Sequence, residues 1–66
     1  MQIEVNGKPK ELEEGRSIAD LISALDLEGH LVVVELNRQI VRQTERADVI
    51  LRQGDRIEIV HFVGGG

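Results

Sequence analysis

The sequence predicts an α+β fold in which a mixed sheet of four or five strands carries one helix packed across one face. Three observations support this prediction. Apolar residues alternate with polar ones at the start of the chain, a single helical stripe follows, and β-branched strand segments come after the stripe. In a chain of 66 residues, the sheet is the only surface that can cover the helix stripe.

The first two strands are predicted to form a hairpin. Polar and apolar residues alternate over residues 1–5, which is typical of a strand buried on one face. Asn6 and Gly7 both tolerate positive φ and favour a two-residue type I′ turn, so the chain returns as a strand over residues 8–12. Pro9 has no amide hydrogen to donate, which is harmless only at a sheet edge. The second strand is therefore an edge strand, and the first is free to pair on its other side.

A polar connection follows the hairpin and leads to the helix. Ser17 is predicted to cap the helix, and Asp20, three residues later, can complete a capping box. From Ile18 the apolar residues fall at i, i+3, i+4 and i+7, the spacing of one helical stripe. We expect the helix to end near Asp26, with Gly29 providing the break. The stripe consists of Ile18, Leu21, Ile22 and Leu25.

The second half of the chain is predicted to return to strands. Residues 31–36 are nearly all apolar and rich in valine, which is typical of a strand with much of both faces covered. A turn follows at residues 37–38, and residues 39–51 hold either one strand or two. Gly54 suits a positive-φ turn that leads into the last strand, expected over residues 56–63.

This order of elements is that of the ubiquitin-like β-grasp fold, in which the first and last strands lie side by side and parallel in the middle of the sheet. We expect one β-grasp domain over residues 1–63 and a flexible glycine tail over residues 64–66. Three consecutive glycines lose much backbone entropy on ordering and contribute no side-chain packing, so such a tail does not stabilise a fold.

The alternation along the last strand predicts an exposed patch. Ile57 and Ile59 are expected to face the helix, so Val60 and Phe62 share the opposite, open face of the sheet. A bulge that turns Phe62 inward is the alternative. An apolar patch of Val60 and Phe62, continuing through Val63 into the tail, would form a docking site for another protein.

Composition argues against several classes of function. The net charge is −4 and there is one aromatic residue, so we expect no nucleic-acid binding. The chain has no cysteine, which removes disulfides, a thiolate nucleophile and sulfur-ligated zinc, and we predict no metal site. No signal peptide or long apolar segment is evident, so we expect a cytoplasmic chain without membrane contact. His30 and His61 are interpreted as surface or strand residues, because no nucleophile or ligand set accompanies them.

Several short motifs occur together along the chain. They are the Asn-Gly hairpin, the helix start over residues 17–22, the strand end Glu35-Leu36-Asn37, the pattern Gly54-Asp55-x-Ile57 and the terminal Val63-Gly64-Gly65-Gly66. Together they resemble the ThiS family, the sulfur carrier proteins of thiamine biosynthesis, over the whole length. The departure is a third glycine, with Gly64 as a spacer before the terminal pair.

The resemblance implies a carrier rather than an enzyme. The carboxylate of Gly66 would be adenylated with ATP by an E1-like, ThiF-like partner and converted to a thiocarboxylate. Gly64 and Gly65 would extend with it into a channel of the partner too narrow for side chains, and Val63 would belong to the docking segment before the tail. A sulfur donor protein would supply the sulfur, and a ThiG-like thiazole synthase would receive it. ATP and Mg would belong to the activating partner, so that this chain itself binds no cofactor.

Other interpretations stay open beside this one. The small subunit of molybdopterin synthase has the same fold and terminus but is usually longer, and other β-grasp sulfur carriers serve cysteine or other sulfur metabolites. A β-grasp interaction module with an inert tail is an alternative from another class, and an enzyme using one of the two histidines is a third.

Overall fold

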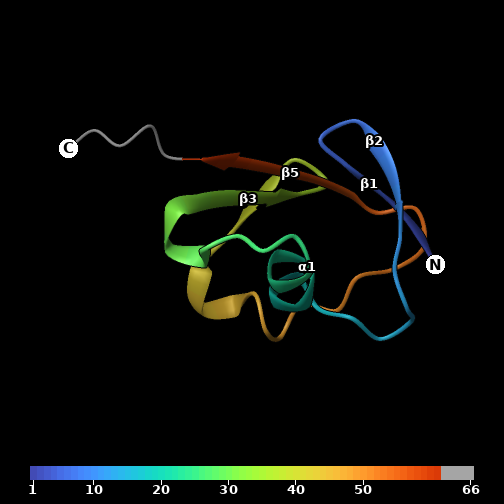
Figure 1. Ribbon diagram of the computed structural model, residues 1–66, viewed down its shortest axis with the longest axis horizontal. Coiled ribbons are helices and arrows are strands. Elements are labelled where there is room, and N and C mark those ends of the chain that lie inside the picture. The colour runs from blue at the N-terminus through green and yellow to red at the C-terminus, as the bar shows by residue number, and fades with distance from the viewer. Residues whose placement is uncertain (62–66) are drawn as a thin grey trace.

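The computed structural model describes residues 1–61, which form one mixed sheet with a helix across one face (Figure 1). The strand order is β2-β1-β5-β3-β4. The predicted α+β arrangement with a single helix is confirmed. The elements are β1 (Gln2–Val5), β2 (Lys8–Glu11), α1 (Ile18–Ala24), the 3₁₀ turn η1 (Gly29–Leu31), β3 (Val32–Leu36), β4 (Gln39–Val41), the 3₁₀ turn η2 (Gln43–Glu45) and β5 (Arg56–His61).

The β1–β2 hairpin has the predicted register. Val5 pairs with Lys8, and the turn residues Asn6 and Gly7 have φ angles of 51° and 81°, as a type I′ turn requires. Pro9 lies in β2 at the edge of the sheet, because β1 pairs on its other side, in parallel, with β5. The interpretation of Pro9 as an edge-strand residue is therefore confirmed.

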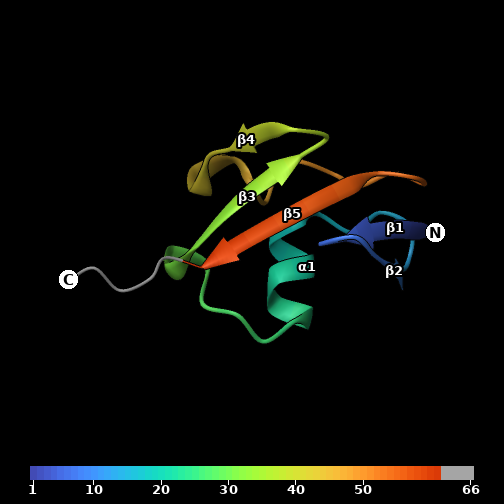
Figure 2. The ribbon, with the colours of Figure 1, turned by 90° about the horizontal axis from the view of Figure 1, so that it is seen from above.

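β5 lies in the centre of the sheet, between β1 and β3 (Figure 2). It runs antiparallel to β3 over five residue pairs, from Leu36 opposite Ile57 to Val32 opposite His61. The two residues predicted to continue this strand, 62 and 63, lie outside the described part of the chain. Of the two options for residues 39–51, the structure contains one strand, β4, which pairs with the end of β3.

The helix begins where the sequence predicts and ends earlier. Ser17 Oγ accepts a hydrogen bond from the Asp20 amide at 3.1 Å, and Asp20 Oδ2 accepts one from the Ser17 amide at 2.9 Å, which completes the capping box. The last helical residue is Ala24. Asp26, with a φ of 59°, takes the left-handed position, and Gly29 does not, so the expectation of a break at Gly29 is wrong.

A Schellman motif explains this early end. The Asp26 amide donates to the Ser23 carbonyl at 3.0 Å, and the Leu27 amide donates to the Ile22 carbonyl at 3.1 Å. These two hydrogen bonds satisfy carbonyls that the helix leaves free, and aspartate is one of the few non-glycine residues that tolerates the left-handed conformation.

The core lies between α1 and the inner face of the sheet. Three of the four residues of the predicted stripe are buried, while Leu25 is only partly buried. Val33 and Glu35, on the other face of β3, are half-buried, so that face of the strand is only partly covered. The buried apolar residues are Ile3, Ile18, Leu21, Ile22, Val32, Val34, Leu51, Ile57 and Ile59.

We expect Ser17→Ala to lower the free energy of unfolding by about 1 kcal/mol, because the Asp20 amide loses its only capping acceptor. Urea denaturation measures this change. Ser23→Ala is the control, since Ser23 is an exposed serine of the same helix. Equal losses in the two variants would contradict the capping role.

A second prediction concerns pH. The hydrogen bond from the Ser17 amide lowers the pKa of the Asp20 carboxyl below its ordinary value of 3.8. The carboxylate therefore stabilises the folded state fully above that ordinary pKa, and its contribution is lost as the pH falls through the lower, folded-state pKa. Asp20→Asn should remove this part of the pH dependence in denaturation curves recorded between about pH 2 and 6. An unchanged pH profile would refute it.

Candidate functional site

The predicted site lies at the end of the chain, and the structure describes only one of its residues. Val60 lies in β5, where 58% of its surface is exposed, as its predicted outward direction requires. The other predicted site residues, which lie outside residues 1–61, are Phe62, Val63, Gly64, Gly65 and Gly66. The interpretations of these five residues, including the exposure of Phe62, therefore stay predictions.

The strand that leads to this segment is held on both sides. On one side β3 pairs with β5 as far as His61. On the other side β1 ends at Val5, and the side chain of Asn6 continues the pairing. Its Oδ1 accepts from the Ile59 amide at 2.7 Å, and its Nδ2 donates to the Ile59 carbonyl at 3.2 Å. The Asn6 amide also donates to the Ile57 carbonyl at 2.9 Å. β5 is thus fixed laterally to within two residues of its described end.

The side of the sheet opposite α1, which we call the outer face, is not covered by the helix (Figure 2). Val60 lies directly opposite Val33, and the edge residue Ile40, opposite Glu35, is 69% exposed. These residues give the outer face an apolar part next to the end of β5. The residues of this face on the paired strands include Glu4, Val33, Glu35, Ile40, Arg56, Glu58 and Val60.

The middle of the outer face is charged and carries more glutamates than arginines. Glu35 and Glu58 lie directly opposite one another on neighbouring strands, an arrangement of like charges that destabilises a sheet. Arg56 Nε lies 3.8 Å from Glu4 Oε2, but this ion pair is exposed and therefore contributes little to the stability of the fold. Glu35 and Glu58 border a depression of about 520 Å³ on this face, which Glu4, Arg38 and Arg56 also line. The outer face therefore combines exposed apolar side chains with charges of both signs, among which the glutamates are more numerous.

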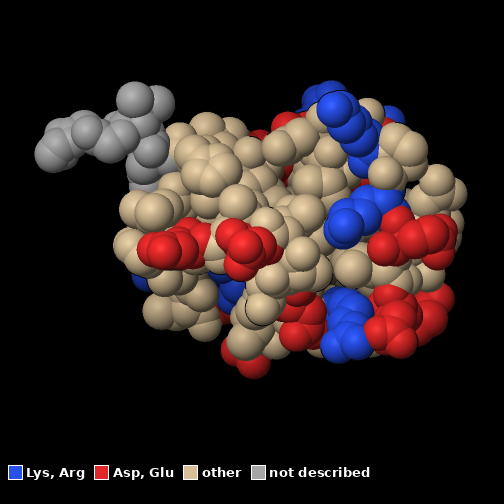
Figure 3. Space-filling view, viewed as in Figure 1, with Lys and Arg blue, Asp and Glu red and all other residues tan. Residues whose placement is uncertain are grey.

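Charged side chains are unevenly distributed over the face of the molecule seen in Figure 3. In the view of Figure 3, lysine and arginine side chains gather mostly at the end that carries the β1–β2 hairpin, whereas the surface beside the end of β5 is mostly uncharged. An uncharged surface next to the predicted tail is suited to contact with another protein.

Residues 1–61 contain no group of three or more His, Cys, Asp or Glu side chains that could hold a metal ion. His30 Nε2 lies 3.6 Å from Glu28 Oε2 in an exposed pair, and His61 is exposed at the end of β5. Within the described part of the chain, the two histidines thus belong to the surface. None of the helices in residues 1–61 has the length and apolar character needed to cross a bilayer.

Two positioning interactions were not predicted from the sequence. The first is the side-chain pairing of Asn6 with Ile59, since the sequence indicated only a turn at Asn6. The second links the turn after β3 to the start of β5. Asn37 Oδ1 accepts from the Arg56 amide at 3.0 Å, and Asn37 Nδ2 donates to Asp55 Oδ1 at 3.2 Å. Asn6 and Asn37 both belong to motifs noted in the sequence, the Asn-Gly hairpin and the end of the strand at Asn37. Their hydrogen-bond partners, however, lie 53 and 18 residues away in the chain, and a single sequence carries no signal of contacts at such distances.

Comparison with known proteins agrees with this architecture. A model described as the ThiS family matches residues 3–66. The sulfur carrier protein ThiS of Bacillus subtilis (strain 168) is 42% identical over 65 residues, which are 97% of this chain and 98% of that protein. A thiazole synthase of Magnetococcus marinus is 38% identical over 66 residues. The chain spans only 20% of the length of that synthase, and likewise 20% of a thiazole synthase of Paramagnetospirillum magneticum.

Comparison with solved structures also leads to the ThiS family. The crystal structure of the thiamine biosynthesis protein ThiS from Geobacter metallireducens matches with a TM-score of 0.87 and 33% identity, and the match covers 100% of both chains. The β-grasp fold is therefore confirmed. With a family model that matches nearly the whole chain and a curated carrier of the same length at 42% identity, the chain belongs to the ThiS family.

Proposed function

We propose that this chain carries sulfur as a thiocarboxylate on Gly66 and donates it to thiazole formation in thiamine biosynthesis. The observation that supports this proposal most strongly is the 42% identity of the chain, over nearly its whole length, to a protein named as the sulfur carrier ThiS. Its match to a fifth of two thiazole synthases supports a ThiG-like synthase as the acceptor.

The chemistry requires an activating partner. A carboxylate is a poor electrophile, so one oxygen of Gly66 first attacks the α-phosphorus of ATP and releases pyrophosphate. A sulfur nucleophile at the oxidation level of sulfide then attacks the acyl carbon, and AMP leaves with the original oxygen. The E1-like partner supplies the ATP site and its magnesium, and a sulfur donor protein supplies the nucleophile. No thiol of this chain is needed, because the sulfur bonds to the terminal acyl carbon.

The outer face supports the same proposal. Ordering each glycine of the tail costs roughly 1–2 kcal/mol, so the tail binds weakly by itself. Burying Val60 and its apolar neighbours against a partner offsets that loss at about 25 cal/mol per Å². The sheet docks, and residues 64–66, which extend roughly 10 Å at about 3.3–3.6 Å per residue, reach the partner's reaction centre.

We expect removal of Gly65 and Gly66, or addition of one residue after Gly66, to abolish sulfur loading without changing the melting temperature. Intact mass measures loading in cells that contain the E1-like enzyme and the sulfur donor. Replacing oxygen by sulfur adds about 16 Da, as does oxidation of Met1, and alkylation separates the two. Because the chain has no cysteine, iodoacetamide labels the thiocarboxylate selectively. Loading of the truncated or extended variant would refute the proposal.

We expect Val60→Asp to lower the kcat/KM of the activating enzyme for this chain by about tenfold or more, because the exposed apolar patch at the root of the tail is lost. The free energy of unfolding should change little, since the side chain is already 58% exposed. Ile50→Asp is the matched control, as Ile50 is 51% exposed and lies outside the sheet strands. Equal effects of the two substitutions would contradict docking through the outer face.

A further inference from the structure

Arg46 is a buried cation that pairs with no carboxylate among residues 1–61. It is only 6% exposed, although it lies in the polar connection between β4 and β5. Its NH1 donates to the Gly29 carbonyl and its NH2 to the Val32 carbonyl, both at 2.8 Å. Among residues 1–61, no atom accepts a hydrogen bond from its Nε, which is also buried. Burial lowers the pKa of Arg46, but an arginine pKa lies so high that the group stays charged.

A buried charge whose hydrogen-bonding groups are incompletely satisfied is unfavourable in a protein interior and needs an explanation. The two carbonyl acceptors satisfy two of the five N–H groups of Arg46 but carry no negative charge. The two hydrogen bonds to Gly29 and Val32 give Arg46 a structural role, because they join both residues to the connection after β4. That role does not explain why the Nε of Arg46 is buried without an acceptor.

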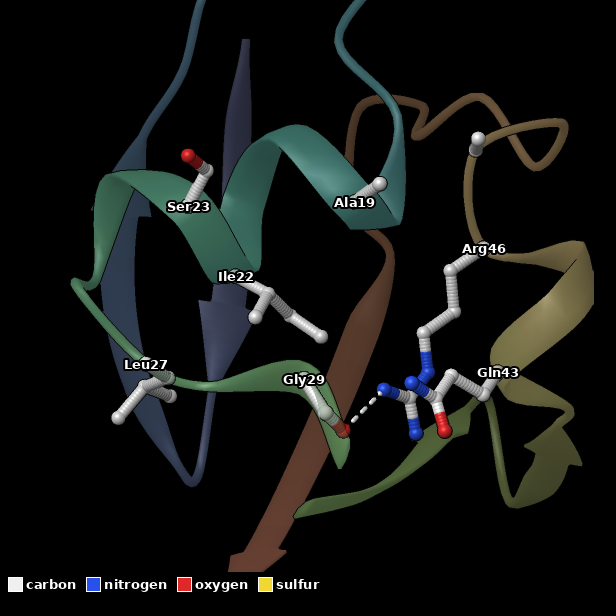
Figure 4. Close-up of a pocket in the computed structure, with 8 residues that line it drawn as sticks. Ala19, Ile22, Ser23, Leu27, Gly29, Gln43 and Arg46 are labelled. Atoms are coloured by element: carbon white, nitrogen blue, oxygen red, sulfur yellow. Dashed lines mark hydrogen bonds between the residues drawn. The ribbon is translucent and has the colours of Figure 1, made fainter. Parts of the chain in front are cut away.

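A surface cavity of about 290 Å³ lies beside this guanidinium, between α1 and η2 (Figure 4). Its walls are mostly apolar, with Ala19 and Ile22 from the helix and Leu27 from the segment that follows. Among the described residues that line it, Arg46 is the only charged one. Figure 4 shows the side chain of Gln43 next to the guanidinium. The cavity is thus electropositive, although the chain carries a net charge of −4.

We propose that this cavity binds a small aliphatic carboxylate, whose oxygens pair with Arg46 and whose carbon chain lies against Ile22 and Leu27. A carboxylate supplies the negative charge and the acceptor for Nε that the protein does not, and guanidinium–carboxylate pairs are among the strongest hydrogen-bonded pairs. Because Nε is buried, the carboxylate reaches it only if a neighbouring side chain moves, and the side chain of Gln43, which lies next to the guanidinium in Figure 4, is an exposed one. This inference is independent of the proposed sulfur carrier function.

The size of the cavity restricts the ligand. Small-molecule sites typically enclose roughly 300–1,000 Å³, so a cavity of about 290 Å³ holds only a short chain. Butyrate is therefore the probe, and butyramide is its neutral counterpart of the same shape. With so few heavy atoms, we expect a dissociation constant on the order of millimolar.

The test is a titration followed by the Arg46 Nε–H signal in ¹H–¹⁵N NMR spectra. We expect butyrate to shift this signal saturably, and butyramide to leave it unchanged. Sodium sulfate at equal ionic strength should not reproduce the shift. A shift that does not saturate, or that sulfate or butyramide reproduces, would overturn the proposal.

Two variants separate binding from folding, and both keep Arg46. Ala47→Leu places a larger side chain at the exposed wall of the cavity and should weaken butyrate binding by about tenfold or more. Gln43→Glu places a carboxylate beside the guanidinium within the same chain, and should abolish the butyrate response while raising the melting temperature. Wild-type butyrate affinity in both variants would overturn the proposal.

Discussion

The burial of Ile57 and Ile59 against α1 is the constraint on which the rest of the structure depends. Side chains of a strand alternate between faces, so burying these two residues forces Glu58 and Val60 onto the outer face. The same burial requires neighbours on both sides of β5, which β1 and β3 supply. The position of the strand at the centre of the sheet and the character of the outer face both follow from this one requirement.

The outer face has features that do not favour stability. Two glutamates face one another across β3 and β5, and apolar side chains lie exposed beside them. Such features are retained in proteins when they serve binding, because an isolated small domain gains nothing from them. The chain's membership in the ThiS family and the character of its outer face both support the proposed docking of this face on a partner.

The fold could be predicted because its signals are local. Alternation over residues 1–5, the cap at Ser17 and the turn glycines each act within a few residues. The end of the helix was predicted to within two residues, but the break was assigned to Gly29, because Asp26 takes a conformation in which glycine is the usual residue. The outward direction of Val60 was predicted from the alternation along the strand and is confirmed, while its role in docking stays a proposal. Asn6 and Arg46 could not be assigned, because their hydrogen-bond partners are distant in sequence and an asparagine in a turn or an arginine in a polar stretch usually faces solvent.

The pairing of Asn6 with Ile59 also restricts how such a chain can diverge. Hairpin turns ordinarily tolerate insertions, since they lie at the surface and few contacts depend on their length. Here one residue of the turn substitutes for a residue of β1, so a longer or shorter turn would detach the neighbour that fixes β5. Length variation among relatives should therefore accumulate in the connection over residues 12–16 rather than at Asn6 and Gly7.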